Sequence, residues 1–301
     1  MILYEALREN RRRTYYLLAF FVALVMATGA ALGYLAGDTC MGLGLALIFA
    51  AFYIPFTYWT AAWQVLNLAG AEEAPEEEYP ELHHLVEELV LAARLPKPKV
   101  YVVKDPAPNA FAAGMKPEES AVAVTTGLLE LLDRESLEGV IAHEISHIRN
   151  GDVKLMTLAI ALVGVIVLLA DLGQRMLWYG GLWGRDRGRR DRDRGGGEII
   201  LVALALLLLL LAPLAAFLTQ MALSRNREFY ADASAVDLTR NPQGLIKALT
   251  LLKEHQATVK RANPATAGMY FVYPFKGEEF WSSLFSTHPP IEERIRRLAA
   301  L

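Results

Sequence analysis

Two long apolar runs near the N-terminus constrain the fold of this chain more than any other feature of its sequence. The first covers about residues 14–36, and the second begins at Met41 and ends at about Trp63. An α-helix rises about 1.5 Å per residue, so each run is long enough to cross the hydrocarbon core of a bilayer. Because only a short turn at residues 37–39 separates them, we expect the two runs to form a transmembrane hairpin.

The charges that flank this hairpin predict its orientation. The turn has no Lys or Arg, whereas basic residues precede the first run: Arg8, Arg11, Arg12 and Arg13. Cytoplasmic ends of membrane helices are enriched in Lys and Arg, so the residues before and after the hairpin are expected in the cytoplasm. We therefore predict a multi-pass protein of the plasma or inner cell membrane. Its termini and its water-soluble part are expected to be cytoplasmic, and the lipid bilayer is one of its partners.

A second pair of apolar runs, at about residues 155–172 and 199–218, is expected to form a second hairpin. The loop between them, residues 173–197, carries seven arginines and three aspartates. If both runs cross fully, this loop lies outside, which conflicts with the positive-inside rule. Either the first hairpin fixes the orientation and the aspartates weaken the signal, or these runs do not span independently. The sequence leaves both accounts open, and the arginine-rich part at 185–194 is expected to be a solvated loop.

Composition excludes several kinds of function. The net charge is −3, and Cys40 is the single cysteine. Proteins that bind nucleic acid usually carry a marked positive patch, so we expect no nucleic-acid partner. One cysteine excludes an intrachain disulfide and a cysteine-rich metal site, which leaves His, Glu and Asp as candidate metal ligands.

The segment at residues 143–147 combines two histidines with an acidic residue in the pattern His-Glu-x-x-His. On a helix, His143 and His147 share one face, so both imidazoles can bind the same Zn²⁺. Glu144 lies beside the first ligand, where it can take a proton from a metal-bound water, as the general base of a metalloprotease does. A solvated helix whose histidines bind nothing is the alternative that the motif alone leaves open.

A catalytic zinc also needs a third protein ligand and an open position for water. Glu228 and Asp232 lie four residues apart, on one face of a helix predicted at 224–232. Glu228 can be the third ligand, while Asp232 can accept a hydrogen bond from the free ring nitrogen of a ligand histidine. An exposed helix with internal Arg–Glu pairs explains the same spacing equally well. An even number of apolar runs separates His143 from Glu228, which puts both on one side of the membrane and favours the metal site.

The segments outside the apolar runs predict helices and a small sheet. Helical spacing covers about residues 80–93, 128–132 and 137–150, and short β-like runs lie at 99–103, 109–113 and 121–125. The acidic stretch at 70–78 is interpreted as a linker that leaves the membrane. We divide the chain into an N-terminal hairpin region (1–69), a first part of the catalytic domain (70–152), a second hairpin (153–222) and a second part of the catalytic domain (223–301).

Four motifs, all in the expected order, resemble the HtpX-type membrane zinc metalloproteases, which are related to the CAAX-prenyl proteases. They are Asn109-Ala110-Phe111-Ala112-Ala113-Gly114, the His-Glu-x-x-His motif, Ser-Arg-x-x-Glu-x-x-Ala-Asp at 224–232, and Thr287-His288-Pro289-Pro290 with Glu293 and Arg294 after it. The resemblance covers essentially the whole chain, and only the arginine-rich loop has no counterpart in the pattern.

The resemblance implies a mainly α, multi-pass membrane protein with two transmembrane hairpins and a gluzincin-like α+β zinc protease domain. One Zn²⁺ per chain would be held by His143, His147 and Glu228, with Glu144 as the base. The implied activity is cleavage of misfolded or damaged membrane proteins at the cytoplasmic membrane surface, as part of stress response and protein quality control. Unfolded or membrane proteins would be the substrates.

Further site residues follow from the same resemblance. Asn109, Ala110, Phe111 and Ala112 would form an edge strand that binds extended substrate by strand addition. His288 would approach the site and stabilise the oxyanion, with Arg294 nearby. On sequence alone, a histidine such as His288 is more often just a turn residue before a proline, and the resemblance reverses that preference.

Two other functions remain as alternatives. The chain could cut within a transmembrane helix, although the His-Glu-x-x-His helix also carries Glu135, Glu138 and Arg149 and lies outside the apolar runs. It could also be a membrane-embedded zinc-binding scaffold whose metal is closed off by a fourth ligand such as His288.

Overall fold

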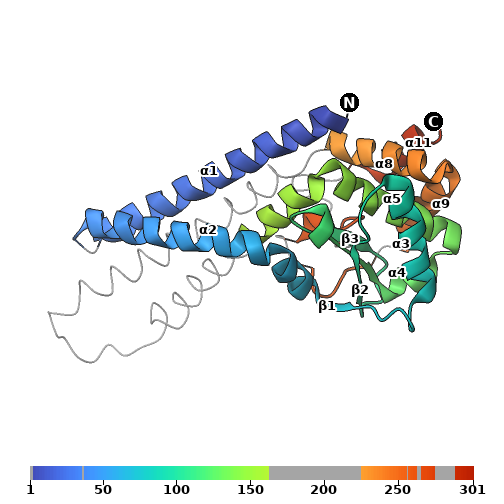
Figure 1. The fold of residues 1–301 in the computed structure, drawn as a ribbon, viewed down its shortest axis with the longest axis horizontal. Coiled ribbons are helices and arrows are strands. Elements are labelled where there is room, and N and C mark those ends of the chain that lie inside the picture. The colour runs from blue at the N-terminus through green and yellow to red at the C-terminus, as the bar shows by residue number, and fades with distance from the viewer. Residues whose placement is uncertain (1–2, 36, 163–224, 256, 263–265, 275–288) are drawn as a thin grey trace, which may run out of the picture.

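The chain folds into a long helical arm attached to a compact part, as Figure 1 shows. The computed structural model describes residues 3–35, 37–162, 225–255, 257–262, 266–274 and 289–301. Helices α1 (Leu3–Leu35) and α2 (Thr39–Ala69) form the arm. Each has a stretch long and apolar enough to cross a membrane, Arg8–Ala30 and Thr39–Ala69. Apart from residues 155–162, the second predicted hairpin and its arginine-rich loop lie outside the described residues.

Glycines allow α1 and α2 to pack closely. A Cβ atom on Gly42 of α2 would lie 2.2 Å from the carbonyl oxygen of Gly29 and 2.6 Å from the Cα of Gly33. Small residues at such a crossing let two membrane helices approach until their backbones touch. At the turn, Gly37 has a positive φ, and the Asp38 carboxylate accepts a hydrogen bond from the Met41 amide to begin α2.

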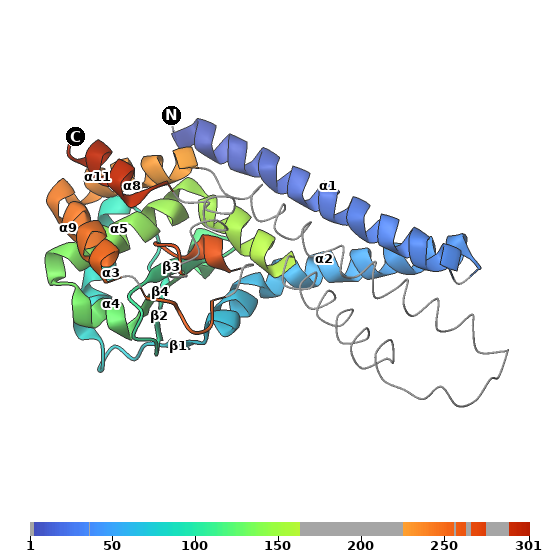
Figure 2. The same cartoon turned by 180° about the vertical axis from the view of Figure 1, so that it is seen from behind.

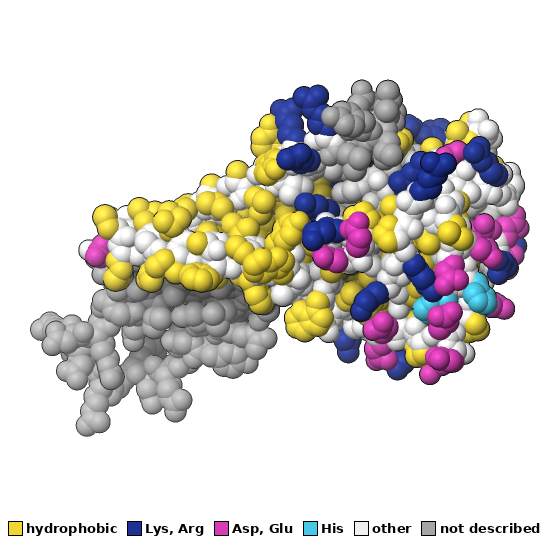
Figure 3. All heavy atoms as spheres, in the orientation of Figure 1, with side chains coloured by type: hydrophobic (Ala, Val, Ile, Leu, Met, Phe, Trp, Pro, Cys, Tyr) yellow, Lys and Arg dark blue, Asp and Glu magenta, His cyan; other side chains and the backbone are white. Residues whose placement is uncertain are grey.

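The described surface of the arm is largely apolar, whereas charged side chains cover the compact part (Figure 3). Large exposed apolar side chains on α2 include Leu45, Ile48, Phe52, Phe56, Trp59 and Trp63. Lys and Arg side chains gather where the arm meets the compact part (Figure 3). This distribution is typical of membrane helices whose ends lie at the interface between lipid and water.

A four-stranded mixed sheet lies in the compact part. The strands are β1 (Ala71–Glu73), β2 (Lys99–Val103), β3 (Ala110–Ala113) and β4 (Ala121–Thr125), in the order β1-β2-β4-β3. β2 and β4 are parallel, and the two outer pairs are antiparallel. Strand β1 corrects the interpretation of residues 70–78 as a linker throughout, because the backbone of 71–73 pairs with β2. β3 is an edge strand among the described strands, with Ala110 opposite Val124.

Helices cover both faces of this sheet. Val100, Val102 and Val122 pack on one face into a core that includes α3 (Pro80–Ala93), α5 (Arg134–Asn150) and α9 (Pro242–Glu254). On the other face, Val103 and Phe111 pack against the end of α2 and the helical residues 152–162. Burial of both faces explains why β4 is apolar throughout rather than alternating.

The remaining described helices complete the compact part. They are α4 (Thr126–Leu131), α8 (Arg225–Thr239), α11 (Ile291–Leu298) and the short 3₁₀ turns Pro117–Glu119 and Ala267–Met269. One hydrophobic core contains residues from 74–153 and from 235–298. The parts of the chain before and after the second pair of apolar runs therefore fold together, and α8 and α5 lie side by side (Figures 1 and 2).

Candidate metal centre and active site

Helix α5 carries three of the predicted site residues and is fixed at both ends. The Asp133 carboxylate caps its first turn by accepting from the Ser136 amide, and Gly151 ends it in the left-handed conformation. A carboxylate at the start satisfies an amide that has no helical partner, and a glycine at the end permits a positive φ. The stretch from Gly139 to Ile148 is buried throughout, so His143, Glu144 and His147 lie inside the protein.

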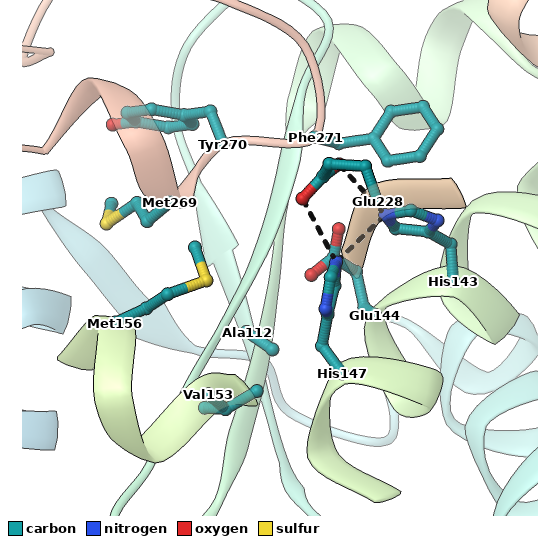
Figure 4. A pocket seen from close by; sticks show the side chains of 10 residues that line it. All are labelled: Ala112, His143, Glu144, His147, Val153, Met156, Glu228, Met269, Tyr270 and Phe271. Carbon is teal, nitrogen blue, oxygen red and sulfur yellow. Dashed lines mark hydrogen bonds and ion pairs between the residues drawn. The ribbon is translucent and has the colours of Figure 1, made fainter. Parts of the chain in front are cut away.

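The two histidines of α5 meet a carboxylate from α8 (Figure 4). The His143 Nε2 and His147 Nε2 atoms are 3.0 Å apart. The Glu228 Oε2 atom lies 3.7 Å from the first nitrogen, and Oε1 lies 3.6 Å from the second. All three residues are buried, and their ligand atoms lie within 4.8 Å of one another. Ligands about 2.1 Å from a tetrahedral metal are about 3.4 Å from each other, so these separations suit one small cation.

The hydrogen bonds of the imidazoles support this fit. His143 Nδ1 lies 2.9 Å from Asp232 Oδ1, and His147 Nδ1 lies 3.0 Å from Asp152 Oδ2. A carboxylate partner assigns the ring proton to Nδ1, which leaves both Nε2 atoms as acceptors. Two acceptors that face each other at 3.0 Å repel unless a cation lies between them, and carboxylate partners of this kind orient metal-binding histidines.

Arg294 holds the first of these carboxylates. Its Nη2 and Nε atoms donate to the two oxygens of Asp232 at 2.7 and 2.9 Å, and its Nη1 donates to the carbonyl oxygen of Phe271 at 3.2 Å. Burial alone raises the pKa of Asp232, but the charge of Arg294 and the bonds from Arg294 and His143 hold it below its usual range. Burial likewise acts to lower the pKa of His143, and bonds to Asp232 and Glu228 raise it overall.

Asp152 is a site residue that the sequence did not reveal. It follows the α5 C-cap glycine, and its side chain reaches back to His147. Helical spacing cannot place it, because the chain leaves the α5 helix at Gly151 before Asp152. A carboxylate directly after the C-cap, five positions beyond a ligand histidine, is the signal that could have drawn attention to it.

Glu144 lies beside the three candidate ligands but is not one of them. The backbone N–H of Ala112 in β3 lies near its carboxylate and acts to lower its pKa. Burial raises its pKa to about 7, against the opposing charges of His147 and Arg294, and the nearby charge of Glu228 adds to the increase. A carboxylate with this pKa can exchange a proton near neutral pH, as a general base must.

Residues 271–272 already bind part of the predicted substrate strand. Asn109 binds the main chain of Val272 on both sides, with bonds of 2.8 and 3.1 Å, and the Phe271 N–H donates to the Ala110 carbonyl at 2.8 Å. Of the predicted strand, Ala112 lines the cavity at the candidate site. Met269, Tyr270 and Phe271 also line this cavity. It has room for about one water molecule and is too small for a peptide.

The predicted site residues therefore fall into three groups. His143, Glu144, His147, Glu228, Asp232 and Arg294 come together in the described residues. Ala110 to Ala112 lie beside them on the edge strand and Asn109 directly precedes it, with Asn109 and Ala110 bound to residues 271–272. His288 lies outside the described residues, so its predicted contribution to the oxyanion remains a prediction.

Comparison with known proteins identifies the family. Residues 76–301 match the model of peptidase family M48. The chain belongs to peptidase family M48. It is 47% identical over 300 residues to "Protease HtpX homolog" of Ligilactobacillus salivarius (strain UCC118) and 49% identical over 298 residues to the protein of that name in Streptococcus pyogenes serotype M5 (strain Manfredo). Each alignment covers 99% of both chains.

This M48 chain also resembles a solved structure, that of S. mikatae Ste24p, with 19% identity and a TM-score of 0.47. The match covers 98% of this chain and 66% of that one. Family membership confirms the predicted resemblance. Together with the His-His-Glu group and the two apolar helices, it supports a membrane metallopeptidase.

Proposed function

We propose that this chain is a zinc-dependent endopeptidase that cuts unfolded or damaged membrane proteins at the cytoplasmic surface of the plasma or inner membrane. The observation that carries the proposal is the buried group formed by His143, His147 and Glu228 with Glu144 beside it. Imidazole nitrogens and one carboxylate oxygen are the donor set of catalytic zinc sites, which keep one position for water. One Zn²⁺ bound there would lower the pKa of a water molecule and polarise a peptide carbonyl.

The residues of the chain supply the other parts of the chemistry. Asp232 and Asp152 keep the two imidazoles in the tautomer that presents Nε2. Glu144 takes a proton from the attacking water and delivers it to the leaving amine, for which a pKa near neutrality is well suited. The Ala112 N–H, which acts to lower the pKa of Glu144, would help to orient this carboxylate.

Substrate is proposed to bind in extended form along β3. Ala112 is the residue of this strand that lines the cavity, and it is adjacent to Glu144. Main-chain hydrogen bonds to an edge strand give affinity that depends little on substrate sequence, as a protease of damaged proteins requires. Because the cavity has room for about one water molecule, we propose that residues 269–271, which line it and bind β3 through Phe271, move away from α5 before a peptide binds.

The first test is cleavage of an unfolded protein by the purified full chain, with and without Zn²⁺, beside Glu144→Gln at equal metal content. We expect zinc-dependent cleavage by the wild type and a loss of about 10²–10⁴-fold in the variant, the usual contribution of a general base. Glu138→Gln, on the same helix but not among the residues that line the cavity, should cleave like the wild type. Equal cleavage by Glu144→Gln and the wild type would refute the role of Glu144. Cleavage that needs no metal would refute the proposal as a whole.

A further inference from the structure

A chain of buried hydrogen bonds connects the first membrane helix to the metal site. Asn10 of α1 donates through Nδ2 to Asp152 Oδ1 at 2.6 Å and to the Asn150 carbonyl at 3.1 Å. The other oxygen of Asp152 is the one that binds His147 Nδ1. Asn10 and Asp152 are 4% and 1% exposed, so water does not replace these bonds. Asn10, which precedes His147 by 137 positions in the sequence, thus contacts the carboxylate that binds this candidate metal ligand.

The orientation of the Asn10 amide is fixed from the opposite side. Arg227 of α8 donates to Asn10 Oδ1 at 3.1 Å, and its Nη1 atom lies 3.7 Å from Asp152 Oδ1. Only a donor on Asn10 suits the carboxylate and the Asn150 carbonyl, and only an acceptor suits the guanidinium, so the amide has one satisfactory orientation. Figures 1 and 2 both show the N-terminal end of α1 beside α8.

Removal of Asn10 would leave a buried carboxylate with one hydrogen bond fewer. Such a carboxylate rotates toward another donor, because a buried charge without its full set of hydrogen bonds is unfavourable. This rotation weakens the bond that fixes the His147 ring, and metal affinity depends on that orientation. Other contacts of α1, such as those of Leu17 and Phe21 with α2 and residues 155–162, do not involve this carboxylate.

We propose that Asn10 is a positioning residue for the metal ligand His147 and that it acts through Asp152. Docking of the N-terminal membrane helix is therefore part of building a tight metal site, although residue 10 precedes the segment 76–301 that matches the family. The inference rests on the proposed metal site and goes beyond it, because it makes metal affinity depend on the first membrane helix.

The test is the affinity of the purified full chain for Zn²⁺, measured by competition with a chromophoric chelator. Asp152→Asn is expected to lose about 10–100-fold in affinity, the usual effect of a group that orients a metal ligand, and Asn10→Leu about 3–10-fold. Asn10→Ala, which cannot clash with its neighbours, should behave like Asn10→Leu.

Thr14→Val is the matched control, because Thr14 is buried one turn further along α1 and bonds only to the Asn10 main-chain carbonyl in the described structure. It should bind Zn²⁺ like the wild type.

The double variant separates positioning from general damage. If Asn10 acts through Asp152, then Asn10→Leu should change affinity less than about twofold in the Asp152→Asn background, because coupled residues are not additive. An equal loss in both backgrounds, an equal loss in Thr14→Val, or wild-type affinity in Asn10→Leu and Asn10→Ala would each overturn the inference. Absence of Zn²⁺ binding by the wild type would overturn the proposed function too, whereas binding without cleavage would leave this inference standing and refute only the protease.

Discussion

Four buried carboxylates surround the two histidines, and their different partners give them different properties. Asp232 accepts hydrogen bonds from two nitrogens of Arg294, and the pKa of Asp232 is held low. The pKa of Glu144 is raised to about 7 mainly by burial. An orienting group has to stay ionised, whereas a base has to exchange a proton, so the two environments match the proposed roles.

The raised pKa of Glu144 predicts a stability cost in the metal-free protein. Its folded-state pKa of about 7 exceeds its usual 4.5, so the folded chain binds more protons than the unfolded chain between these values. The free energy of unfolding therefore falls as pH rises from about 4.5 to 7 and is constant above that. Glu144→Gln removes this loss, which is on the order of 3 kcal/mol. We expect the metal-free variant to unfold at a higher temperature than the wild type at pH 8, with a smaller gain at pH 5.

The comparison of the two pH values is the control for this prediction. A substitution that changed packing alone would shift the unfolding temperature by the same amount at pH 5 and pH 8. That result, or a variant less stable than the wild type at pH 8, would contradict the raised pKa. Gln keeps an oxygen that can accept from the Ala112 N–H, so the backbone contact is conserved in the comparison.

Arg294 is predicted to stabilise the fold by compensating Asp232. It is 1% exposed and forms two short bonds to that carboxylate. Arg294→Met leaves a buried charge without its main partner, which costs about 3–5 kcal/mol. The free energy of unfolding of the metal-free protein measures this loss. Arg296→Met, on the same helix but with a side chain 77% exposed, should change stability by less than about 1 kcal/mol, and equal losses in the two variants would contradict the argument.

Helical spacing predicted which side chains on one helix share the site, but it did not predict the side chains that reach the site from other parts of the chain. Residues four apart on one helix face the same way whatever surrounds them, which is why His143 with His147 and Glu228 with Asp232 could be paired from the sequence. Asp152 reaches the site from just beyond the end of α5, and Asn10 reaches Asp152 from α1. Contacts of that kind depend on tertiary packing, which no local period encodes.

Among the elements, those with a strong local period were predicted closely. Helix α3 runs from Pro80 to Ala93 and strands β2 and β4 cover 99–103 and 121–125, as expected. Strand β1 was missed because its sequence, Ala-Glu-Glu, has low β-propensity and forms a strand only by pairing with β2. The occupation of the β3 edge by residues 271–272 was also missed, since Asn109 and Val272 lie 163 positions apart in the sequence.

The contact between α1 and α2 gives a prediction for the arm. A Cβ on Gly42 would lie 2.2 Å from the Gly29 carbonyl, whereas a Cβ on Gly44 meets nothing within 4 Å. Gly42→Ala should therefore lower the unfolding temperature in detergent, because overpacking costs about 1–3 kcal/mol. Gly44→Ala, two residues further along α2, should leave the unfolding temperature unchanged or raise it, since Ala is favoured over Gly in a helix by about 1 kcal/mol. Equal effects of the two substitutions would contradict the close packing.

At the scale of the whole molecule, the surface of the arm is mainly apolar, whereas that of the compact part is rich in charged side chains. The described surface of the arm is largely apolar apart from an acidic side chain at its tip, and Lys and Arg gather where the arm meets the compact part (Figure 3). The candidate site lies in the compact part, between α5, α8 and β3 (Figure 4). Hydropathy predicted the first two helices, but it does not determine which way they cross, so the cytoplasmic position of the site is a proposal that needs its own test.

The single cysteine makes this test direct. Cys40 is exposed in the first turn of α2, beside the turn that joins the two helices of the arm. A membrane-impermeant maleimide added to intact spheroplasts that express the chain should label Cys40, and Cys40→Ser should remain unlabelled. In the Cys40→Ser background, Leu91→Cys provides a matched reporter on the compact part, because Leu91 is 78% exposed on α3. This cysteine should react only after lysis. The reverse pattern would put the site outside the cell, and labelling of both cysteines in intact spheroplasts would show that the arm does not cross the membrane, because a crossing hairpin separates its turn from its base by the thickness of the bilayer.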